Sequence, residues 1–123
     1  MDFRSTLKKN YEFKRLYNKG KTAVTPYMVV YVTPYMVVYA LKNHHGTRRV
    51  GYTVSTKLGK AVVRNRIRRR LREIYRLNSD KLKTNVDIVI VARSRCVQAE
   101  YAKMEKAFLH ACAELDILRG DEQ

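Results

Sequence analysis

Residues 57–76 read KLGKAVVRNRIRRRLREIYR, and this stretch decides both the fold and the chemistry that we expect of the chain. Its apolar residues recur at spacings of four, four and three, which is the periodicity of one face of an α-helix. They are Val63, Ile67, Leu71 and Ile74. Arginine and lysine fill most of the other positions. The stretch therefore predicts a helix with one face for a protein core and the remaining surface for a polyanion.

The cationic surface of this helix carries a single acid, Glu73, which can pair with Arg69 or Arg76. A solvated surface helix is the ordinary explanation of a charge run, but such helices usually mix the two signs. Arginine also predominates over lysine here, and its planar guanidinium binds phosphate through two hydrogen bonds and stacks on bases. The pattern favours nucleic-acid binding over a plain surface helix.

Composition limits the class of protein. The chain has 123 residues, of which 46% are hydrophobic, and this predicts a single domain over residues 1–123. Its formal net charge is +15, which favours an anionic partner. The longest apolar stretch, residues 27–41, is interrupted by Thr33 and Pro34 and is too short to span a bilayer, so no membrane partner is expected. Without an apolar signal segment, and with Cys96 and Cys112 lacking ligand spacing, we expect a cytoplasmic protein with reduced thiols.

The basic helix and the strand before it also resemble a known family. The quoted residues are Gly51-Tyr52-Thr53-Val54-Ser55, Gly59, Lys60, Arg64-Asn65-Arg66, Arg68-Arg69 and Arg72-Glu73, with Arg49 and Lys57 also in register. They resemble the signature of the bacterial ribonuclease P protein component, in which an "RNR" helix follows a strand of the form R-x-G-x-x-V-S-K-K-x-G. Thr56 departs from it, because the family usually has a lysine there. The match is specific at the helix and extends more weakly over nearly the whole chain.

The resemblance implies a role within a ribonucleoprotein. In that family the RNA subunit is the catalyst and uses magnesium ions to cleave the 5′ leader from precursor tRNA. The protein subunit binds the ribonuclease P RNA through the RNR helix and holds the leader of precursor tRNA in an aromatic cleft. The residues that we expect to contact RNA are Lys57, Lys60, Arg64, Asn65, Arg66, Arg68, Arg69 and Arg72. For the leader cleft we expect Phe13, Tyr17 and one of the paired tyrosines Tyr31 and Tyr39. Core contacts are the other interpretation of Phe13 and Tyr17.

One segment of the chain is duplicated. Residues 25–31 and residues 33–39 both read TPYMVVY, at a period of eight. One continuous strand would be too long for a domain of this size, and Pro34 lacks the donor that a central strand needs. Because the period is even, either copy could fill the same strand slot with the same facing, but both cannot fill it at once. We therefore expect the second copy in the sheet and the first copy displaced from it. The displaced copy would be apolar, which predicts a dimer formed through it.

The predicted elements give an α/β fold. We expect helices over residues 11–18, 60–76 and 99–118, and strands at 21–24, at one copy of the repeat, at 49–55 and at 86–92. Strand 49–55 is expected to pair antiparallel with the repeat. The predicted architecture is a two-layer α/β sandwich with a mixed four-stranded sheet and helices packed on it. The resemblance further implies a left-handed βαβ crossover, which pattern alone does not predict.

Other functions remain open at this point. We find no arrangement of Cys and His or of Ser, His and Asp that predicts catalysis by the protein alone, and no metal-ligand spacing. A general RNA-binding or ribosome-associated protein without an enzymatic partner is the alternative function. A DNA-binding helix is a third, but this basic helix is also a core helix, and no zipper or half-site dimer pattern accompanies it.

Overall fold

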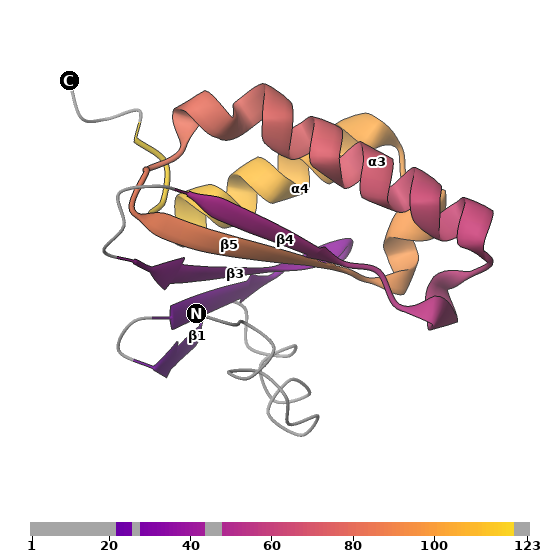
Figure 1. Ribbon diagram of the computed structural model, residues 1–123, viewed down its shortest axis with the longest axis horizontal. Coiled ribbons are helices and arrows are strands. Elements are labelled where there is room, and N and C mark those ends of the chain that lie inside the picture. The colour runs from indigo at the N-terminus through magenta and orange to yellow at the C-terminus, as the bar shows by residue number, and fades with distance from the viewer. Residues whose placement is uncertain (1–21, 26–27, 44–47, 120–123) are drawn as a thin grey trace.

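The computed structural model describes residues 22–25, 28–43 and 48–119 (Figure 1). The strands are β1 Thr22–Thr25, β2 Met28–Val32, β3 Met36–Lys42, β4 Arg49–Thr53 and β5 Val86–Ala92. The helices are α3 Ala61–Asn78 and α4 Tyr101–Glu114, with short 3-10 turns η1 Thr56–Leu58, η2 Ser79–Lys81 and η3 Ser94–Gln98. The helix predicted over residues 11–18 lies outside the described residues.

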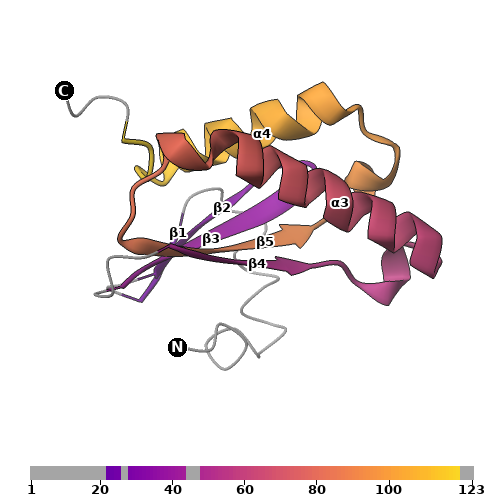
Figure 2. The same ribbon diagram turned by 45° about the horizontal axis from the view of Figure 1, so that its top comes forward.

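The strands form one mixed sheet, and both described long helices lie on the same face of it (Figure 2). The strand order is β1-β2-β3-β5-β4, and only β4 and β5 pair in parallel. The helix α3 connects these two parallel strands, which forms the strand–helix–strand unit that the resemblance implied. The predicted two-layer α/β sandwich is confirmed, but the sheet has five strands instead of four.

The fifth strand exists because both copies of the repeat enter the sheet. The first copy supplies β2 and the second supplies β3, and the two pair antiparallel. Thr33 closes the turn between them: its backbone N–H donates to the carbonyl of Met36 at 2.9 Å, and its hydroxyl oxygen accepts from the Met36 N–H at 3.0 Å. The prediction that the first copy is displaced from the sheet is wrong, because Pro34 lies in a turn and not in a strand. The argument for a dimer through a displaced copy therefore no longer holds.

The turn also decides which way each copy faces. Met28 pairs with Leu41, and Val32 pairs with Val37. Residues that pair across two strands share a face, and neighbours along a strand alternate between faces. Tyr31 pairs with Val38, the neighbour of Tyr39, so equivalent residues of the two copies lie on opposite faces of the sheet. Tyr31 consequently faces the helices and Tyr39 faces away from them. The even period would give the two tyrosines the same facing only in one continuous strand, and the turn between β2 and β3 excludes that strand.

The partner of β4 also differs from the prediction. Strand β4 pairs in parallel with β5 at the edge of the sheet, and it does not pair with the repeat. Strand β5 lies between β3 and β4 and is buried at six of its seven positions, whereas β4 has no buried position. The more apolar strand thus occupies the central place, as the hydrophobic effect favours.

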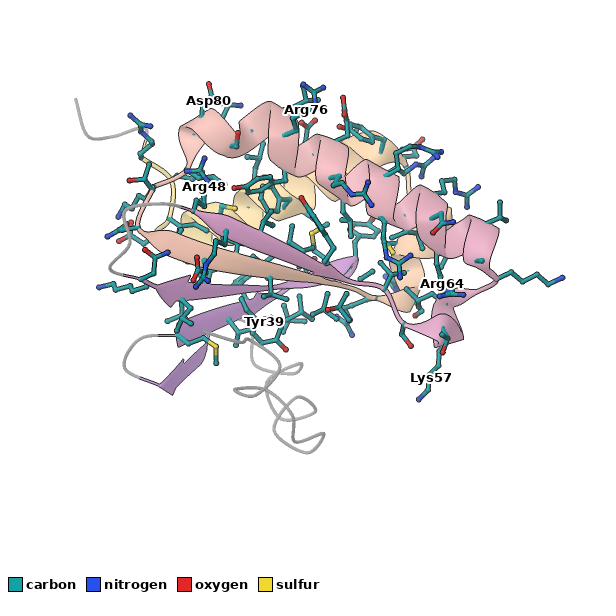
Figure 3. All side chains as sticks on the ribbon, viewed as in Figure 1. Tyr39, Arg48, Lys57, Arg64, Arg76 and Asp80 are labelled. Atoms are coloured by element: carbon teal, nitrogen blue, oxygen red, sulfur yellow. The ribbon has the colours of Figure 1, made fainter. Side chains whose placement is uncertain are left out.

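Both faces of the sheet bury apolar side chains. The larger core lies between the sheet and the helices, and its fully buried members include Met36, Val38, Ile67, Leu71, Ile88, Ile90, Met104 and Phe108. A second cluster on the opposite face contains Met28, Val30, Val37, Tyr39, Leu41 and Val89. Figure 3 shows Tyr39 on this second side. Strand β3 contributes to both clusters, which explains why it is apolar at successive positions.

Candidate nucleic-acid interface

The start of α3 is set by the short segment before it. The Ser55 hydroxyl accepts a hydrogen bond from the Lys57 N–H at 3.1 Å and so caps η1. Gly59 follows with a backbone φ of 148°, which residues other than glycine rarely adopt. A Cβ atom at Gly59 would lie 3.1 Å from Val63. This glycine therefore allows the chain to turn tightly from η1 into the first turn of α3.

The apolar face of α3 fixes the direction of its cationic surface. Ile67, Leu71 and Ile74 are buried and Val63 is partly buried, as the sequence predicted. Because these residues face the sheet and α4, the remaining surface of the helix faces outward. The predicted RNA contacts lie on this surface and in the segment just before the helix: Lys57, Lys60, Asn65, Arg66, Arg69 and Arg72 are exposed, while Arg64 and Arg68 are half-buried. We call these eight residues the α3 face.

Several arginines of the α3 face are held by neutral partners. Arg64 Nε donates to the carbonyl of Gly59 at 3.2 Å, and an Arg66 guanidinium nitrogen donates to the carbonyl of Val97 at 3.3 Å. Arg68 donates to Asn65 Oδ1 at 3.1 Å. Such contacts orient a guanidinium but leave its full positive charge. No carboxylate in the described part of the chain forms an ion pair with any residue of the α3 face.

The far end of α3 behaves differently. The carboxylate of Glu73 pairs with Arg76, with 2.6 Å between Oε2 and Nη2, and not with Arg69. The hydrogen bonds that Arg76 donates to the Glu73 carboxylate lower the pKa of Glu73 and raise the pKa of Arg76. This pair neutralises the last turn of the helix. The unneutralised cations therefore belong to the first three turns, near Lys57 and Arg64 in Figure 3.

Arg49 belongs to the quoted signature, but its contacts are structural. Its guanidinium binds Asp87 of β5 at 2.7 Å, and the Asp87 side chain is almost completely buried. Asn43 donates a second hydrogen bond to Asp87 at 2.8 Å. Burial alone would raise the pKa of Asp87, but these hydrogen bonds and the charge of Arg49 together hold it below its usual value. Sequence analysis did not identify Asp87 as the partner, because the parallel pairing of β4 with β5 was not predicted.

The structure separates the tyrosines considered for the leader cleft. Tyr31 is half-buried on the helix side, where its hydroxyl is hydrogen-bonded to His110 Nε2 at 3.1 Å. Tyr39 lies on the other side of the sheet and has no exposed area. Phe13 and Tyr17 lie outside the described residues. Tyr31 and Tyr39 therefore cannot line one cleft together, and the cleft stays a prediction.

The described part of the chain has other features that bear on metal, thiol and membrane chemistry. No group of three or more His, Cys, Asp or Glu residues within it has an arrangement that could hold a metal ion. Cys96 and Cys112 are free and buried, and burial raises the pKa of Cys112 to about 12. Neither α3 nor α4 has the length and apolarity that a bilayer span requires. Beside Tyr31, α4 carries Lys103, Lys106 and His110, which the sequence analysis did not single out.

Comparisons with known proteins agree with this geometry. The family model described as Ribonuclease P matches residues 1–116. The ribonuclease P protein component of Alkaliphilus oremlandii is 39% identical over 114 residues, covering 93% of both chains, and that of Clostridioides difficile is 40% identical, covering 95% of this chain and 98% of its own. The solved structure of the Staphylococcus aureus RNase P protein is 29% identical, has a TM-score of 0.62 and covers 91% of this chain and 95% of its own. The Thermotoga maritima RNase P protein also has a TM-score of 0.62, with 27% identity over 85% of this chain and 89% of its own. The chain therefore belongs to the ribonuclease P protein component family.

Proposed function

We propose that this chain binds the RNA subunit of ribonuclease P through the α3 face, and that it holds the 5′ leader of precursor tRNA during 5′-end maturation. Membership of the family makes the chain the protein subunit of a ribonucleoprotein endonuclease, with ribonuclease P RNA as its partner. The alternative of a general RNA-binding protein without an enzymatic partner is not favoured by these relatives.

The α3 face is the observation that carries the proposal. It combines eight residues, seven of them cationic, on the outward side of α3 and in the segment that leads into it, and the opposite side of the helix is fixed in the core. No described carboxylate neutralises these cations, so they can displace the counterions condensed on RNA phosphates, and the release of those counterions favours binding. The contacts of Arg64 and Arg66 with backbone carbonyls restrict the orientation of two guanidinium groups of this face before RNA binds.

The leader hypothesis rests on aromatic chemistry. Aromatic side chains hold unpaired nucleotides without reading their sequence. Tyr39 lies on the sheet face away from α3, so a leader bound there would be separate from the RNA bound to the α3 face. Because Tyr39 has no exposed area, its role in this proposal is to support the floor of the cleft, and Phe13 and Tyr17 supply the stacking surfaces.

The proposal places the catalytic step in the RNA subunit. The described residues of this chain do not fit a magnesium site, since they contain no suitable cluster of ligands. As the resemblance implies, the proposal assigns the magnesium ions of the reaction to the RNA. The part of the protein is to reduce repulsion between two polyanions and to keep the precursor in place, which lowers the concentration of magnesium that the ribonucleoprotein needs.

Reconstitution tests the proposal. The protein is mixed with a bacterial ribonuclease P RNA, and cleavage of precursor tRNA is measured at low magnesium. We expect strong stimulation by the full chain, a clear loss for Arg66→Ala/Arg68→Ala, and full stimulation by Lys42→Gln/Lys83→Gln. The second pair removes the same charge at the end of the sheet where Lys42 pairs with Val86. No stimulation by the unmodified protein would leave a general RNA binder as the better description.

A further inference from the structure

A groove lies between the turn of the duplicated hairpin and the outer side of α4. Its volume is about 430 Å³, and its walls include Tyr31, Pro34 and Tyr35 from the hairpin and Lys103, Lys106 and His110 from the helix. A second hollow of about 390 Å³ shares Tyr35 and Lys103 and continues past Arg95 along η3. Because the two hollows share Tyr35 and Lys103 as walls, they lie next to each other at this end of the sheet, and we call them together the groove.

The first copy of the repeat builds one wall of this groove. Tyr31 faces the helices from β2, and its ring meets the ring of His110 edge to face, with 5.5 Å between centroids and an interplanar angle of 74°. The turn behind it is braced, because Arg93 donates to the carbonyl of Thr33 at 2.8 Å. Without β2, His110 would lose this neighbour. The groove is thus a product of the extra strand.

The groove combines aromatic walls with positive charge. Lys103, Lys106 and His110 lie three and four residues apart on α4, which places them along one side of the helix. The Lys103 amine lies 3.9 Å from the carboxylate of Glu100, and both side chains are more than half exposed, so this pair neutralises little. No other described carboxylate lines the groove.

We propose that this groove binds an unpaired segment of RNA, with a base against Tyr35 and the adjoining phosphates on Lys103 and Lys106. An aromatic platform next to cations is the arrangement by which proteins hold single-stranded nucleic acid. A cavity of this size suits a nucleotide, whereas a double helix is recognised across a much wider surface, of roughly 16 base pairs. The choice of RNA over other anions rests on the proposed function of the chain.

The path of the RNA follows from the neighbours of η3. Arg66 and Arg70 of α3 donate hydrogen bonds to the carbonyls of Val97 and Ala99, and both of these residues line the second hollow. The groove therefore begins beside the α3 face. An RNA strand bound there can pass over η3 and enter the groove with its unpaired end, which adds a contact beyond the α3 face and the predicted leader cleft.

Binding of a fluorescein-labelled oligouridine of about eight nucleotides tests this site, with anisotropy measured on the full chain. At about 0.1 M salt we expect Lys103→Gln/Lys106→Gln to weaken binding roughly tenfold, because two phosphate contacts are lost. The matched control, Lys42→Gln/Lys83→Gln, removes the same charge at the other end of the sheet and should leave the affinity unchanged. An equal loss for both pairs would show that net charge alone binds the oligonucleotide, and would overturn the groove.

The aromatic wall needs its own variants. Tyr35→Leu keeps an apolar side chain but removes the stacking surface, and we expect at least about a fivefold loss of affinity. Tyr35→Phe keeps the ring and should bind like the unmodified protein. Equal affinity for both variants contradicts stacking at Tyr35. Labelled oligoglutamate serves as a second probe: if it binds as tightly and depends on the same residues, the occupant is an acidic protein segment and the proposal is wrong.

The test separates this inference from the proposed function. Binding of ribonuclease P RNA should fall strongly for Arg66→Ala/Arg68→Ala and much less for Tyr35→Leu, because the groove adds only one contact to those of the α3 face. If the groove variants bind oligouridine normally while the α3 variants lose the ribonuclease P RNA, the groove is not a site and the proposed function stands. If neither RNA is bound by the unmodified chain, both fail together.

Discussion

Tyr31 and Tyr39 occupy the same position in two identical seven-residue segments, yet they lie on opposite faces of the sheet. Tyr31 pairs with Val38 and faces α4, where it meets His110. Tyr39 pairs with Val30 and is completely buried in the second cluster. The same seven-residue sequence thus lies in two environments. The turn at Thr33 pairs Tyr31 with Val38 and not with Tyr39, and neighbouring residues of a strand face opposite sides of the sheet.

This pair provides a stability test with a built-in control. Tyr39→Ala removes a large side chain that has no exposed area, and we expect the free energy of unfolding to fall by ~3–5 kcal/mol. Tyr31→Ala loses one half-buried ring and one hydrogen bond, for which ~1 kcal/mol is expected. Urea denaturation of both variants measures the difference. Equal losses would contradict the opposite facing of the two copies.

The two sides of α3 should separate binding from stability. Leu71 is completely buried, so Leu71→Ala should lower the free energy of unfolding by ~2–5 kcal/mol. Arg66 is exposed, so Arg66→Ala should leave the melting temperature nearly unchanged and weaken binding to ribonuclease P RNA. Thermal melts and filter binding on the same preparations check both. The reverse result would mean that the assignment of the two faces is wrong.

Salt dependence should report the phosphate contacts. If about five residues of the α3 face contact phosphates, the logarithm of the affinity should fall with the logarithm of salt concentration at a slope of roughly −4. Titration of the chain with ribonuclease P RNA at several salt concentrations measures the slope. Arg66→Ala should reduce the magnitude of this slope by about 1, because one phosphate contact is lost. A slope near zero would rule out binding dominated by phosphates.

The features predicted correctly from sequence are those that depend on local pattern. The helical period of Ile67, Leu71 and Ile74 needs no partner to be recognised, and the apolar run over residues 86–92 gave β5 with the bounds that the structure has. The cationic surface followed from the same helix, because burying one side exposes the other. Local physics was sufficient for these elements.

Strand pairing and the groove depend on partners that are distant in sequence. The first copy of the repeat lies between β1 and β3 as β2. Strand β5 lies beside β4, where the repeat was expected. One signal for the hairpin was present: Thr33 and Pro34 separate two β-prone segments by a short loop, which is a hairpin pattern. It was interpreted as a break in one strand. The groove on α4 could not be foreseen, since it exists only because β2 brings Tyr31 beside His110.

Stability should depend on pH through Asp87. Its native pKa lies below the usual value because Arg49 and Asn43 bind the carboxylate, so in acid the unfolded chain takes up this proton first. The stabilisation is complete above the ordinary pKa of 3.8 and is lost as the pH falls through the lower native value. Urea midpoints measured from neutral to acid pH should fall more steeply for the unmodified chain than for Asp87→Asn. Parallel curves would contradict the role of this carboxylate.

Deletion of residues 25–32 should remove the extra strand without removing the RNA-binding helix. The second copy keeps its pairing with β5 and its contribution to the core, so we expect a folded chain that binds ribonuclease P RNA as before. The deletion also removes Tyr31, one wall of the groove, so affinity for oligouridine should fall.

The same pair of proteins settles the role of the repeat in assembly. In the full chain the first copy pairs with β1 on one side and with β3 on the other, so its backbone donors and acceptors have partners within the molecule. We therefore expect light scattering to give a monomer for both the full chain and the deletion variant. A dimer seen only for the full chain would show that the first copy exchanges between two molecules instead of forming β2 within one.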